Sequence, residues 1–115
     1  MSYRSASKIA VVISASLAVT FPRISEALAT DFTAKTVMEK MQPEQRYAYV
    51  AGVVEGLAYS RYAKDGKKTD GMECIYDWFY TKPDTLDLIY AGFGQYPQYP
   101  PGAIIGALSQ KSCGG

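Results

Sequence analysis

The stretch from Pro43 to about Lys64 constrains the fold of this chain more than any other part of its sequence. The apolar residues that recur there at the spacing of one helix face are Val50, Val53, Val54, Leu57 and Ala58. A proline opens the stretch and Gly66 follows it, and both are typical of helix ends. No segment alternates apolar and polar residues over the length of a strand. The sequence therefore predicts an all-α fold around one long helix.

Four shorter segments also carry helical spacing, and with the long helix they predict a small bundle of four to five helices. They are residues 31–41, 71–80, 83–95 and 101–113. Asp70 followed by Glu73 has the spacing of a capping box, so we expect Asp70 to cap its helix. The chain contains no internal repeat and no sign of a second domain.

The N-terminus, residues 1–29, has the composition of a cleaved secretory signal peptide. Two basic residues and no acid precede an apolar run at 9–21, and the small-x-small sequence at 27–29 suits a cleavage site. A membrane anchor is the alternative, but such a run spans roughly 20 Å against the roughly 30 Å of hydrocarbon in a bilayer. We expect export to the periplasm or secretion, with a single helical domain at 30–115 that is not bound to the membrane after cleavage.

Charged side chains are nearly balanced, with 12 Lys and Arg against 11 Asp and Glu in the whole chain. No basic cluster follows one predicted helix face, which argues against nucleic-acid binding. Lys64, Lys67 and Lys68 form the only basic run, and Asp65 interrupts it. We expect a solvated loop there, with Lys67 and Lys68 as candidate contacts to a protein partner.

Cys74 and Cys113 are the two cysteines of the chain, and both lie in the part expected to be exported. An oxidising compartment lets cysteines pair, and so small a domain gains from a covalent link. The bridge would close a loop of about 40 residues and contribute roughly 4 kcal/mol in the chain-entropy model. Two buried free thiols are the alternative. A metal site is disfavoured because the chain has no histidine.

The long predicted helix carries Gly52 and Gly56, each of which costs a helix interior about 1 kcal/mol relative to alanine. Together with Tyr49 and Tyr59 they form a flank of small and aromatic residues, where small residues would let another helix approach closely. We expect that close contact within the monomer, with a homodimer interface or a ligand contact as alternatives. Glu55 on this flank is expected to be an ordinary charge at the edge of the stripe, paired with tyrosine hydroxyls or an arginine; a buried carboxylate or a partner-binding anchor is the alternative.

Aromatic residues are abundant, with ten tyrosines and one tryptophan. Both residue types anchor interfaces, but they also fill small helical cores. We expect Trp78 and Phe79 in the core. Tyr96 and Tyr99 lie on the proline-rich stretch YPQYPP and are candidate partner-binding residues, with packing as the alternative.

The types and spacing of the residues in this sequence support no catalytic arrangement. Without histidine, nucleophiles of the Ser-His and Cys-His kinds are excluded, and there is no glycine-rich phosphate loop. Paired carboxylates remain formally available, but no two of them are placed to face a cleft. We expect a protein that is not an enzyme and that uses no cofactor and no metal.

Two segments resemble the Rap/Tai family of periplasmic immunity proteins associated with type VI secretion. YVAGVVEG at 49–56 is similar to the central helix signature of that family, and PPGAIIGALSQKSC at 100–113 is similar to its last helix. The residues that match the family pattern are Tyr49, Gly52, Glu55 and Cys113. Family members usually have a cysteine just before the central motif, where this chain has Arg46 and Tyr47. The chain therefore resembles a divergent member, in which Cys74 would be the partner of Cys113.

The resemblance implies a small helical periplasmic protein that binds and blocks a peptidoglycan amidase. It also implies a homodimer that inserts a loop into the amidase cleft. Two other functions fit the same features of the chain. One is an envelope stress chaperone whose carboxylates titrate on acidification and expose aromatic surface. The other is a structural subunit of an envelope complex, docking through the Gly52 and Gly56 flank.

Overall fold

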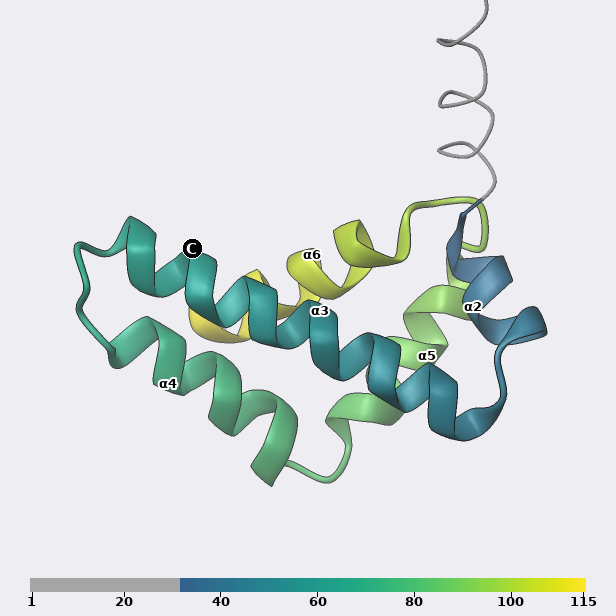
Figure 1. Cartoon of the computed structure of the whole chain (residues 1–115), viewed down its shortest axis with the longest axis horizontal. Coiled ribbons are helices and arrows are strands. Elements are labelled where there is room, and N and C mark those ends of the chain that lie inside the picture. The colour runs from purple at the N-terminus through teal and green to yellow at the C-terminus, as the bar shows by residue number, and fades with distance from the viewer. Residues whose placement is uncertain (1–31) are drawn as a thin grey trace, which may run out of the picture. The chain divides into compact units, whose positions relative to one another are not determined.

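The computed structural model describes residues 32–115, which form five α-helices and one π-helical segment, with no strand among them. In chain order these are α2 (Ala34–Lys40), α3 (Pro43–Lys64), α4 (Asp70–Tyr76), η3 (Asp77–Thr81), α5 (Thr85–Gln95) and α6 (Pro101–Cys113) (Figure 1). This confirms the expected all-α bundle. The predicted signal peptide at 1–29 lies outside the described residues.

Helix α3 is the long helix predicted from the sequence, and local bonds explain both of its ends. Pro43 occupies the first turn, while the backbone N–H of Gln42 donates to Oε1 of Gln45 at 2.8 Å. At the other end Gly66 adopts a φ of 68°, a left-handed conformation that glycine accepts without strain. The backbone N–H of Lys67 then closes the helix by donating to the carbonyl of Tyr62 at 2.9 Å.

The start and the end of the predicted helix at 71–80 both differ from expectation. Thr69, and not Asp70, precedes the first turn of α4, and its carbonyl accepts from the N–H of Glu73 at 2.8 Å. The predicted capping box is therefore wrong, because Asp70 and Glu73 both lie inside the first turn. The helix then widens into η3, where the Thr81 hydroxyl donates to the carbonyl of Asp77 at 2.7 Å.

Every described helix contributes side chains to the hydrophobic core, and α3 contributes through one face. Val50, Val54 and Ala58 of α3 are fully buried, as their helical spacing predicts. Trp78 and Phe79 are also buried, which confirms their expected place in the core. The other buried apolar residues are Ala34, Val37, Ile75, Ile89, Phe93, Ile104 and Ile105.

The disulfide between Cys74 and Cys113 is present and joins α4 to the last residue of α6, with 5.8 Å between the two Cα atoms. Arg61 of α3 holds the same corner. Its guanidinium donates to the carbonyls of Cys113 at 3.3 Å and Gly114 at 2.9 Å, and to Asp65 Oδ2 at 2.8 Å. Three helices therefore meet at a covalently closed end.

Helix α2 is fixed at the opposite end of α3. Its first backbone N–H groups donate to the loop between α5 and α6, from Ala34 to the carbonyl of Tyr99 and from Lys35 to that of Pro97, both at 2.9 Å. Arg46 of α3 donates to the carbonyl of Met41 at 3.2 Å, just after α2 ends. Among the described helices, none is long and apolar enough to cross a membrane.

Candidate functional site

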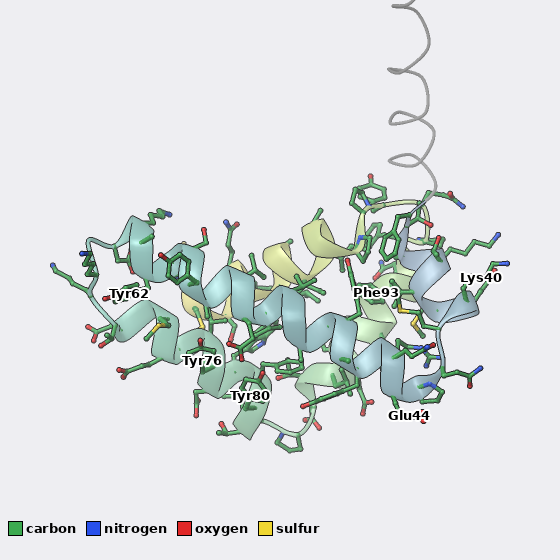
Figure 2. All side chains as sticks on the ribbon, viewed as in Figure 1. Lys40, Glu44, Tyr62, Tyr76, Tyr80 and Phe93 are labelled. Atoms are coloured by element: carbon green, nitrogen blue, oxygen red, sulfur yellow. A yellow bond between two sulfur atoms is a disulfide. The ribbon has the colours of Figure 1, made fainter. Side chains whose placement is uncertain are left out.

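Glu55 is the centre of a side-chain cluster that bridges α3 to α4 and η3. Its Oε1 accepts a hydrogen bond from the Tyr76 hydroxyl at 3.1 Å, and its Oε2 accepts one from the Tyr80 hydroxyl at 2.8 Å. Figure 2 shows both tyrosines along the seam between α3 and the helix that carries them. The expected pairing of Glu55 with tyrosine hydroxyls is therefore confirmed. The carboxylate is exposed, so the alternative of a buried acid is wrong.

Both phenols that donate to Glu55 have a raised pKa. The bond from Tyr80 and the nearby negative charge, together with partial burial, raise the pKa of Tyr80 to about 12. Desolvation is the main cause that raises the pKa of Tyr76, and its bond to Glu55 adds to the effect. A phenol is protonated at neutral pH even at its ordinary pKa of 10.0, so both tyrosines are donors there and hold the carboxylate from two sides.

Ring contacts fix these tyrosines in place. The ring of Tyr80 meets Phe79 edge-on at 4.9 Å between centroids and lies 6.2 Å from the ring of Tyr76. Tyr47 of α3 stacks on Phe79 at 5.9 Å. Because Phe79 is buried, it anchors the exposed rings of Tyr47 and Tyr80 to the core.

Gly52 and Gly56 lie on the exposed face of α3 beside Glu55. Apart from the nearby backbone of α3 itself, no atom of residues 32–115 would lie within 4 Å of a Cβ atom added at either glycine. The expected close contact within the monomer is therefore wrong for residues 32–115. The physical reason is the direction of the core stripe, because α3 packs through the face of Val50 and Val54 and leaves the glycine face to solvent.

The two tyrosines predicted for the same flank have different surroundings. Tyr59 is 68% exposed, whereas Tyr49 is half-buried with its ring 5.4 Å from that of Phe32. Tyr49 thus packs near the start of the described chain and does not join the exposed face. We call the exposed surface around the carboxylate the Glu55 patch, and it comprises Tyr47, Gly52, Glu55, Gly56, Tyr59, Tyr76 and Tyr80.

The other candidate partner-binding residues lie on separate surfaces. Tyr96 and Tyr99 are exposed on the loop between α5 and α6, with ring centroids 5.5 Å apart. They border an apolar groove of about 480 Å³ that is also lined by Leu88, Ala91, Ala103, Ile104 and Leu108. Lys67 and Lys68 are exposed on the α3–α4 loop, at the far end of α3 (Figure 1). The structure therefore does not bring the predicted partner-binding residues together.

Sequence reasoning did not identify Tyr47, Tyr76 and Tyr80 as site residues. A signal was present, because Tyr76 and Tyr80 are four residues apart and so share one face of a predicted helix. Nothing in the sequence, however, indicates which face of α3 they meet. Within residues 32–115 there is no group of three acidic, cysteine or histidine residues that could hold a metal ion.

Comparison of the chain with protein-family models, with curated proteins and with solved structures found no match.

Proposed function

We propose that this chain is an exported, non-catalytic helical binding protein of the immunity type, which inhibits a cell-wall amidase by covering its cleft. The observation that carries the proposal concerns the motif at 49–56. Gly52 and Glu55, which match the Rap/Tai signature, lie on the surface and are not needed to fill the core. A partner that docks on this face would account for the helix-disfavouring glycines Gly52 and Gly56, which the isolated fold does not explain.

The Glu55 patch has the properties of a protein-binding surface. Its exposed tyrosines are residue types that commonly anchor interfaces. The rings of Tyr47 and Tyr80 contact Phe79, and the Tyr80 hydroxyl donates to Glu55, so these two side chains lose little conformational freedom when a partner binds. Gly52 and Gly56 leave the backbone of α3 open to close approach.

The direct test uses residues 30–115 and a peptidoglycan amidase encoded next to the gene of this protein. We expect a stable complex by calorimetry and loss of peptidoglycan hydrolysis at equimolar inhibitor. Gly52→Leu should abolish binding and leave the fold intact, because the added side chain projects into open space. Gly94→Leu is the matched control. Gly94 is also an exposed helical glycine with open space at its Cβ position, but it lies on α5 and is not part of the Glu55 patch. A complete lack of affinity for neighbouring amidases would refute the proposal.

A structural subunit of an envelope complex is the second candidate, because an exposed glycine face also suits permanent docking. A pull-down from a periplasmic extract separates the two functions. Recovery of a peptidoglycan hydrolase supports the immunity function, whereas recovery of envelope structural proteins supports the subunit. A stress chaperone, the other alternative from the sequence, would instead retain many unfolded proteins and suppress aggregation of a client at low pH.

A further inference from the structure

Glu55 carries a negative charge that no cation of residues 32–115 neutralises. The one ion pair in this part of the chain joins Arg61 to Asp65. Arg61 is further occupied by the carbonyls at the end of α6, and Lys64 donates to the carbonyl of Gly115. Arg46 donates to carbonyls near the end of α2 and lies over the ring of Tyr90. The carboxylate of Glu55 has tyrosine hydroxyls as its partners, and they are neutral donors.

The carboxylate of Glu55 can accept further hydrogen bonds on both of its oxygens. A carboxylate offers about four lone-pair positions, two on each oxygen. Tyr76 occupies one position on Oε1 and Tyr80 occupies one on Oε2. Each oxygen therefore keeps capacity for a further N–H donor, and a guanidinium group can supply one donor to each oxygen. An ammonium group is a point charge and cannot match both oxygens in the same way.

The surroundings of Glu55 leave room for such a group and provide surfaces for it. Gly52 and Gly56 flank the carboxylate on α3, and no described side chain occupies the space above either of them. Tyr59, one turn beyond Glu55, is 68% exposed, and Tyr80 is 48% exposed. Guanidinium groups stack on the faces of aromatic rings, so these tyrosines would add to the attraction of the carboxylate.

We infer that the Glu55 patch is a binding site for an arginine side chain of a protein partner. Glu55 supplies the two acceptor oxygens, Tyr76 and Tyr80 fix their direction, and the glycines of α3 give access. The inference rests on the proposed function only in taking the partner to be a protein. It adds the chemistry of recognition, namely a basic residue at the centre of the partner surface.

The test is an NMR titration of residues 30–115 with three capped amino acids. N-acetyl-arginine amide should produce saturable shifts of the Gly52, Glu55 and Gly56 amides, with millimolar affinity. The lysine analogue should bind several-fold more weakly, and the citrulline analogue, which keeps the shape but lacks the charge, should produce no saturable shift. Equal responses to arginine and citrulline, or no response to arginine, would overturn the inference.

Two variants assign the response to the carboxylate. Glu55→Gln keeps an acceptor for one tyrosine but loses the charge, so arginine affinity should fall at least tenfold. Glu73→Gln on α4 is the matched control, because Glu73 is also exposed but its side chain makes no hydrogen bond to a tyrosine of residues 32–115, and it should leave the titration unchanged. An unchanged response in Glu55→Gln would contradict the site. Shifts at the same amides on dilution, without added ligand, would show that a second copy covers the patch, and would also contradict it.

These outcomes are independent of the amidase experiment. The titration uses the isolated protein, so arginine binding without amidase binding would refute the immunity function and retain the site. If the Glu55→Gln variant still inhibits the amidase, the immunity function stands, but arginine recognition by Glu55 is not part of it.

Discussion

At the scale of single residues, the bonds between Glu55 and its tyrosines have a measurable consequence for titration. The hydrogen bond to Glu55 is the main reason why the pKa of Tyr80 rises from 10.0 to about 12. In Glu55→Gln we expect this pKa to fall back towards 10.0, because the charged acceptor is lost. NMR of the tyrosine ring carbons during a pH titration would measure it, with Glu73→Gln as the control. An unchanged pKa in Glu55→Gln would mean that burial, and not the carboxylate, causes the shift.

The same residue pair determines a dependence of stability on pH. The pKa of Tyr80 is higher in the folded protein than in the unfolded chain, so folding favours the protonated phenol. This contribution is fully present below pH 10.0 and is lost as the pH rises towards about 12. Urea midpoints measured across that interval should therefore fall less steeply in Glu55→Gln than in the wild type.

The sequence predicted part of the Glu55 cluster and missed the rest for a clear reason. An acid among small and apolar residues suggested either tyrosine hydroxyls or an arginine as partners of Glu55, and the structure shows the tyrosine hydroxyls. Which tyrosines they are depends on the rotation of α4 and η3 against α3, which packing of the buried side chains sets. Local spacing carries no information about that rotation.

At the scale of helices, periodic patterns predicted which elements exist, whereas hydrogen bonds at their ends set the limits. Pro43 and Gly66 are strong local signals, so the bounds of α3 follow directly from the sequence. The start of α4 does not, because the carbonyl of Thr69 takes the place expected for the side chain of Asp70. The widening into η3 after Tyr76 also has no signal in the apolar pattern.

Helix packing also separates two kinds of glycine that look alike in the sequence. Gly56 lies in a helix interior with open space at its Cβ position, so Gly56→Ala should stabilise the monomer by up to about 1 kcal/mol. At Gly71 of α4 a Cβ would lie 2.5 Å from Nε and 2.8 Å from Cγ of Arg61. Gly71→Ala should therefore displace Arg61 from the carbonyls of α6 and destabilise the protein by about 1–3 kcal/mol.

Urea unfolding of these two variants beside the wild type measures both changes. Opposite signs are expected, and Gly94→Ala serves as a second open-space control, because nothing lies within 4 Å of its Cβ position. If Gly56→Ala destabilised the monomer as much as Gly71→Ala, then α3 would make a close contact through its glycine face after all.

At the scale of the whole described domain, the ends of α3 are held by different kinds of bond. The end near Lys64 is closed by the disulfide and by Arg61, and the end near Pro43 is held by backbone bonds of α2 and by Arg46. The sequence predicted the disulfide, because two cysteines in a small domain that is expected to be exported have few other roles. The contacts of Arg46 and Arg61 could not be predicted, since they depend on carbonyls brought close by the fold.

The disulfide should therefore be the main cross-link of the domain. It joins residues 39 positions apart, and the chain-entropy model assigns about 4 kcal/mol to a loop of this size. Cys74→Ser combined with Cys113→Ser should lower the free energy of unfolding by about that amount. Urea unfolding of the double variant gives the value, and reduction of the wild type with a phosphine should produce the same loss.

Hydrogen exchange should accelerate first in α6, because its C-terminal residue is released while α2 keeps its bonds to the loop at the other end. A loss spread equally over α2 and α6 would instead mean that the two ends of α3 unfold as one cooperative unit.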